Sequence, residues 1–135
     1  MSVELVRESK AASPWELFDV EQLRAQLPES GVAFWEFLRV PSLHLALYRL
    51  PKGAKDMQSP HEEDEVYYVI EGRGRIRLGD GDSQDVRTVE PGMVLHVKAA
   101  ESHSFFEIEE DMLLLVLFSV GGSTDLPTPR SLLTR

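Results

Sequence analysis

From residue 31 to residue 118 the chain alternates short strand-like segments with turn signals, and this pattern constrains the fold most. Eight segments carry the aromatic, branched or alternating apolar residues typical of strands. They span residues 32–40, 42–50, 66–70, 74–78, 86–89, 93–97, 103–108 and 112–118. Glycine, proline and aspartate residues separate many of them, and no helical pattern intervenes. The sequence therefore predicts an all-β sandwich or closed barrel.

The residues before this region carry helix signals instead. The segment Ser13–Glu16 has the form of a capping box with proline at the first helical position. Asp19 offers a second cap ahead of Leu23 and Leu27, and Pro28 ends the pattern. We expect one or two short helices between residues 13 and 27.

Composition limits the classes of protein to which the chain can belong. It has 135 residues and no cysteine, which excludes a disulfide scaffold and thiol chemistry. The 23 acidic residues outnumber the 14 basic ones, and the net charge of −9 argues against nucleic acid or an anionic membrane as a partner. The longest apolar run, Met112–Phe118, is far shorter than a membrane span. We expect a cytoplasmic protein with an N-terminal arm containing a short helix over residues 1–30, a barrel over 31–120 and an extended tail over 121–135.

The densest group of chemically active residues lies between Gly53 and Gly72. Here His61 and Glu65 stand four residues apart, where a predicted loop enters a predicted strand. An imidazole nitrogen and a carboxylate oxygen together suit a borderline transition metal. The remaining histidines, His44, His96 and His103, are the candidates for a third ligand.

The spacing in this region resembles the first motif of the cupin superfamily, G-x5-H-x-H-x3-E-x6-G. Gly53, His61, Glu65 and Gly72 stand at four of its five positions. Ser59 stands where the family has its first histidine.

The second motif of the family, G-x5-P-x-G-x2-H-x3-N, is matched less fully. Gly92 and His103 have the right spacing, whereas Lys98, Ala100 and Glu107 replace the proline, the second glycine and the asparagine. Together the two motifs span residues 53–107, and their order along the chain is that of the family.

The resemblance implies a double-stranded β-helix, or jelly-roll barrel, with a metal in its mouth. His61, Glu65 and His103 would be the ligands of a divalent transition metal such as Fe, Mn, Ni or Zn. Two histidines and one carboxylate match the facial triad of non-heme iron sites. The Ser59 hydroxyl would be a poor fourth ligand. Serine in place of histidine at this position therefore fits either a catalytic site with an open ligand position or a degenerate site that binds metal weakly.

Other residues are candidates to line the pocket or to orient a ligand. Tyr67 shares a predicted strand face with Glu65, although a core aromatic is the simpler interpretation of this residue. Glu107 shares a predicted face with His103. His96 could replace the missing imidazole at Ser59 if its side chain points inward. His44 lies among leucines, and a hydrogen-bonded core histidine is the simpler interpretation there.

Three functions stay open for such a barrel. The first is a metal-dependent dioxygenase acting on a small polar molecule, and the second is an isomerase, epimerase or lyase that uses the metal as a Lewis acid. The third is a non-enzymatic protein that binds a small ligand. The run Leu113–Leu117 is apolar on both strand faces, and we expect it to form a homodimer interface or a deep sheet centre.

Overall fold

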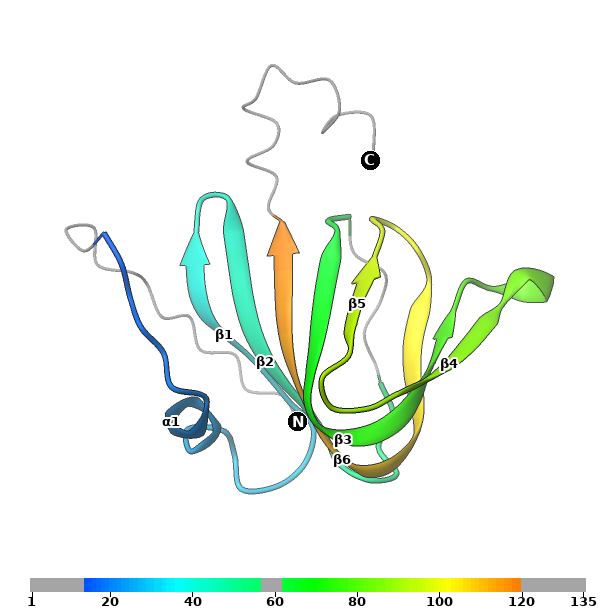
Figure 1. Cartoon of the computed structure of the whole chain (residues 1–135), viewed down its shortest axis with the longest axis horizontal. Coiled ribbons are helices and arrows are strands. Elements are labelled where there is room, and N and C mark those ends of the chain that lie inside the picture. Colours follow the sequence, from blue (N-terminus) through cyan, green and yellow to red (C-terminus); the bar gives the residue numbers. More distant parts are fainter. Residues whose placement is uncertain (1–13, 57–61, 120–135) are drawn as a thin grey trace, which may run out of the picture.

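The computed structural model describes residues 14–56 and 62–119, which form a short helix and a six-stranded antiparallel sheet (Figure 1). In chain order the elements are α1 (Val20–Arg24), β1 (Ala33–Val40), β2 (Leu43–Leu50), β3 (Glu65–Leu78), the 3-10 turn η1 (Gly81–Ser83), β4 (Asp85–Val89), β5 (Val94–Val97) and β6 (His103–Ser119).

The sheet has the strand order β1-β2-β6-β3-β4, and β5 pairs with the beginning of β3. The two long strands β3 and β6 pair along nearly their whole length. Figure 1 shows both of them bending in the lower part of the view, so that the sheet curls back and its two halves face each other. The prediction of an all-β jelly-roll barrel with a short N-terminal helix is confirmed.

Irregular pairing explains the bend. Three register shifts interrupt the β3–β6 ladder between Val69 and Arg75, and such bulges increase bending and twist. Gly72 lies at the crossing with a φ of 93°, and a Cβ there would overlap Asp111 O and Met112 Cα. Only glycine allows the two backbones to approach this closely.

Two hydrophobic cores follow from the alternation of side chains along these strands. The inner core fills the barrel and unites both halves of the sheet, with Ala46 and Val116 from one half and Ile76 and Phe105 from the other. The outer core lies on the opposite face of β1, β2 and β6. There Leu23 packs with strand residues of that face.

The helix signals before residue 31 are only partly realised. Asp19 caps α1 by accepting hydrogen bonds from the backbone N–H groups of Glu21 and Gln22. No helix begins at Pro14 in the described residues, although the capping-box pattern predicts one there. Ser13, the arm before it, and the predicted C-terminal tail lie outside the described residues. In the described ranges, no helix has the length and hydropathy needed to cross a bilayer.

Candidate metal centre

The curl of the sheet brings together Glu65 and His103, two of the three ligands that the sequence predicts. In the β3–β6 ladder Glu65 pairs with Phe118, whereas His103 pairs with Leu78 at the far end of β3. The two residues are therefore separated by the length of a strand pair within the sheet. They meet only because the barrel closes.

Glu65 and His103 form a buried pair. The Nε2 atom of His103 lies 3.0 Å from Oε1 of Glu65, and each side chain is only 1% exposed. Burying a carboxylate in an apolar barrel is costly unless a cation or hydrogen bonds compensate it. A buried acid–imidazole pair of this kind is more typical of a functional site than of a structural core.

A hydrogen bond from Nδ1 fixes the orientation of the His103 ring. Nδ1 lies 2.9 Å from the backbone carbonyl of Glu101, and a carbonyl can only accept, so Nδ1 carries a proton. With a proton fixed on Nδ1, Nε2 is the ring nitrogen that can bind a metal ion. Metal-binding histidines are commonly oriented in this way by a backbone carbonyl.

The surroundings raise the pKa of His103 above its ordinary value. Burial by itself lowers this pKa. Hydrogen bonds to Glu65 and to the Glu101 carbonyl raise it, as do the negative charges of Glu65 and Asp56, and together these effects exceed that of burial. In the absence of a metal, the barrel therefore favours an imidazolium ion beside the carboxylate.

Tyr67, on the same strand face as Glu65, completes this cluster. Its hydroxyl donates to Oε2 of Glu65 at 3.2 Å and lies 3.1 Å from Nε2 of His103. Burial and the nearby charge of Glu65 raise the Tyr67 pKa far above its ordinary value. Tyr67 therefore stays protonated and holds the two groups from one side.

Asp56 and Tyr48 are members of the site that the sequence analysis does not identify. The Tyr48 hydroxyl donates to Oδ1 of Asp56 at 2.5 Å, and the backbone N–H of Phe105 donates to Oδ2 at 2.9 Å. Burial and the charge of Asp56 raise the pKa of Tyr48, and the same carboxylate contributes to the raised pKa of His103. These contacts join residues as many as 49 positions apart, so no local motif signals them.

The Glu65–His103 pair fits a metal ion chemically. Two ligand atoms at right angles, each about 2.1 Å from an ion, are separated by about 3.0 Å. The observed distance between Nε2 and Oε1 is 3.0 Å. An N/O donor pair also suits zinc, iron, nickel or manganese better than it suits calcium.

The described residues supply two of the three predicted ligands, Glu65 and His103. Across residues 14–56 and 62–119, no three His, Cys, Asp or Glu side chains form a group that could hold a metal ion. His61 and Ser59 lie outside these ranges. His44 is half-buried, with Nδ1 3.3 Å from Oε2 of Glu36, which agrees with its interpretation as a structural histidine.

The two remaining candidates lie away from the Glu65–His103 pair. His96 pairs with Val66 on the outer face of the barrel, where its side chain is 57% exposed and Nε2 lies 3.2 Å from Oδ2 of Asp64. Glu107 is exposed and accepts a hydrogen bond from Arg75 at 3.0 Å. Its φ of 47° interrupts the strand alternation that would place it beside His103.

Comparisons with known proteins agree with this architecture. Residues 46–119 match the model of the cupin domain. An uncharacterized protein of Streptomyces coelicolor is 38% identical over 102 residues, covering 76% of this chain and 93% of that protein. The crystal structure of a Thermus thermophilus protein is similar with a TM-score of 0.64 and 25% identity, covering 78% of this chain and 97% of that one.

An enzyme is also among the similar structures. Oxalate decarboxylase of Bacillus subtilis matches with a TM-score of 0.55 and 27% identity, covering 59% of this chain and 22% of the enzyme. Work on that enzyme describes its Mn(II) centres. The barrel, the order of its motifs and the match over residues 46–119 establish the family: the chain belongs to the cupins.

Proposed function

We propose that the protein is a metal-dependent cupin enzyme that acts on a small molecule. His61, Glu65 and His103 would hold a divalent transition metal, with Fe, Mn, Ni and Zn as the candidates. The observation that carries the proposal is the buried Glu65–His103 pair, in which Nε2 of the imidazole is turned toward the carboxylate at 3.0 Å.

The residues around this pair would hold it ready for a metal. The Glu101 carbonyl keeps the proton of His103 on Nδ1, which leaves Nε2 as the ligand atom. The Tyr67 hydroxyl restrains the second oxygen of Glu65. Burial excludes water from both groups, which strengthens electrostatic interactions within the site.

The donor set supports oxidative chemistry first. Two histidines and a carboxylate leave ligand positions for a substrate and for oxygen, as in non-heme iron dioxygenases. Bound there, a metal would supply either oxygen activation or the polarisation of a carbonyl or carboxylate. The manganese of oxalate decarboxylase, a structural neighbour, supports the second possibility, which includes lyase and isomerase reactions.

Elemental analysis of protein purified without a metal-affinity tag tests the metal site. We expect nearly one transition metal per chain in the wild type and strong depletion in Glu65→Gln and His61→Ala. His96→Gln is the matched control, because it changes an exposed imidazole on the outer face. Equal metal content in all four proteins would contradict the proposal, as would a wild type that cannot be loaded with any of the four metals.

We also propose a homodimer formed through the outer face of the sheet. Within the run Leu113–Leu117, Leu115 and Leu117 lie half-buried on that face. Nearby, Tyr68 is 40% exposed and its strand partner Val94 is 66% exposed. An open apolar surface next to the outer core is suited to a second copy of the same sheet.

A further inference from the structure

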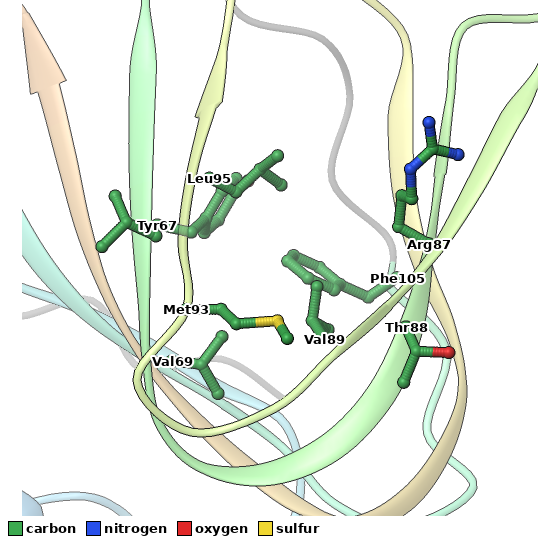
Figure 2. Close-up of a pocket in the computed structure, with 9 residues that line it drawn as sticks. Tyr67, Val69, Arg87, Thr88, Val89, Met93, Leu95 and Phe105 are labelled. Carbon is green, nitrogen blue, oxygen red and sulfur yellow. The ribbon is translucent and has the colours of Figure 1, made fainter.

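A largely apolar cavity of about 340 Å³ lies in the barrel beside the candidate metal centre. Figure 2 shows its lining side chains converging from β3, β4, β5 and β6, and Met93 joins them from just before β5. The apolar part of the wall includes Val69, Val89, Met93, Leu95, Phe105 and the ring of Tyr67. A cavity of about 150 Å³ with such a lining already holds benzene, so this one has room for a substituted ring or a branched chain.

The cavity adjoins the Glu65–His103 pair without including it. Tyr67 is shared, because its ring forms part of the wall while its hydroxyl contacts both members of the pair. Phe105 packs edge-on against that ring, with 5.1 Å between centroids. A molecule in the cavity would therefore contact the same tyrosine that orders the pair.

One charged side chain stands at the rim of this apolar space. Arg87 pairs with Ile76 in the β3–β4 ladder, and Ile76 is buried in the inner core, so Arg87 starts from the inner face of its strand. Its side chain is 66% exposed. Figure 2 shows the guanidinium across the cavity from Tyr67 and Leu95.

One edge of the guanidinium, formed by Nε and Nη2, has no hydrogen bond to any described residue. Nη1 donates to the Val86 carbonyl at 3.1 Å and lies 3.6 Å from Oδ1 of Asp85. In the described part of the chain, no hydrogen bond engages Nε or Nη2 of Arg87. Adjacent N–H groups of this kind bind a carboxylate with two parallel hydrogen bonds.

An inward-pointing charge on an edge strand has another known use, since it discourages pairing with a second sheet. That use requires no cavity beside the charge. Here an apolar cavity lies next to an arginine whose bidentate edge meets no acceptor within residues 14–56 and 62–119. This combination favours a ligand with an anionic head and an apolar body.

We propose that the cavity binds a small monocarboxylic acid, with its apolar body between Met93 and Phe105 and its carboxylate on Arg87. This inference goes beyond the proposed function and does not require a bound metal. It states which class of small molecule the cavity would bind. The residues proposed to hold the metal do not determine that class.

Calorimetric titration with hydrocinnamate and with hydrocinnamyl alcohol tests the assignment, since the two probes share a body and differ in charge. We expect the acid to bind about tenfold more tightly than the alcohol, because the hydrogen bonds to a carboxylate are charge-assisted. Arg87→Gln should abolish this preference, because it weakens binding of the acid much more than binding of the alcohol. Arg77→Gln is the control, because Arg77 lies on the outer face, 4.0 Å from the centroid of the Phe106 ring.

A second variant tests the cavity itself. Met93 is 44% exposed at the end of the turn before β5, so Met93→Trp can fill the cavity without disturbing the inner core. The variant should bind both probes more weakly than the wild type does. An unchanged circular dichroism spectrum would show that the fold is preserved. Failure of both probes to bind the wild type would overturn the proposal, as would a preference for the acid that survives Arg87→Gln. Metal content measured on the same samples separates this outcome from failure of the metal site.

Discussion

At the scale of single residues, Tyr67 connects the two halves of the candidate site. Its hydroxyl contacts Glu65 and His103, and its ring borders the apolar cavity. Because its pKa is raised by burial and by the charge of Glu65, it acts as a hydrogen-bond donor and not as a base. We regard it as a positioning residue for the metal ligands.

Tyr67→Phe should therefore weaken metal binding while preserving the fold. The substitution removes one hydrogen-bond partner from each of two buried polar groups, which costs about 1–3 kcal/mol of stability in the metal-free protein. Loss of a group that orients a ligand lowers metal affinity roughly 10- to 100-fold. Competition titration with a chelating dye measures the affinity, and urea unfolding measures the stability.

Tyr68→Phe provides the matched control, because the neighbouring tyrosine points to the outer face and is partly exposed. It should leave metal affinity unchanged. If both variants bind metal as the wild type does, Tyr67 does not position the ligands.

The pair also predicts a pH dependence. The folded state raises the pKa of His103 above the value of about 6.5 expected in the unfolded chain, so folding favours the protonated ring. The resulting stabilisation is complete below about pH 6.5 and is lost as the pH rises through the folded pKa. Metal-depleted protein should therefore become less stable over this range, whereas metal affinity should increase as the proton leaves.

Urea unfolding of chelator-treated protein over a series of pH values measures this effect. His103→Gln has no imidazole, and its profile should be flatter above pH 6.5. The same slope in both proteins would show that His103 does not take up the extra proton on folding.

At the scale of elements, the crossing of β3 and β6 determines whether the site can form. Glu65 and His103 lie at opposite ends of the β3–β6 pairing, and the bend at Gly72 is what turns them toward each other. Gly72 lies against the backbone of Asp111 and Met112. The geometry of the site therefore depends on a residue that contacts neither ligand.

Gly72→Ala should destabilise the protein by about 3 kcal/mol or more, because backbone strain and overlap with the opposite strand add together. Gly53→Ala is the control, since Gly53 also has a positive φ, 77°, but its Cβ would have open space. There the cost should be about 1 kcal/mol, from strain alone. Equal unfolding midpoints for the two variants in urea would contradict this explanation of the bend.

The sequence predicts where strand residues occur, but it does not predict which neighbouring segments join into one continuous strand. Residues 66–70 and 74–78 join as β3, and residues 103–108 and 112–118 join as β6. In the sequence, Gly72 and the acidic run 109–111 resemble turns between strands. In the structure, β3 and β6 are paired both before and after these positions. A linear pattern cannot distinguish a bulge within a strand from a turn between two strands.

The site can be predicted from the sequence only where side chains follow regular strand alternation. Tyr67 follows regular alternation and lies where its spacing from Glu65 predicts. Glu107 does not, because a positive φ at that residue changes the side-chain direction. The contribution of Asp56 arises from contacts across the barrel, which local spacing does not reveal.

At the scale of the whole molecule, the outer face of the sheet is the proposed contact between two copies. Val94→Glu would place like charges on both sides of a symmetric interface, in a chain whose net charge is already −9. We expect the wild type to sediment as a dimer and Val94→Glu to sediment as a monomer. Gln84→Glu adds the same charge in an exposed segment beside η1 and should stay dimeric. A monomeric wild type would contradict the interface.

The central claim is that the barrel holds a transition metal between Glu65 and His103. The most direct measurement is an anomalous difference map from crystals of the manganese-loaded protein. We predict a single strong peak about 2.1 Å from Nε2 of His103 and from a carboxylate oxygen of Glu65. A map without a peak at this position, or with its only peak at the exposed Asp64–His96 pair, would contradict the account.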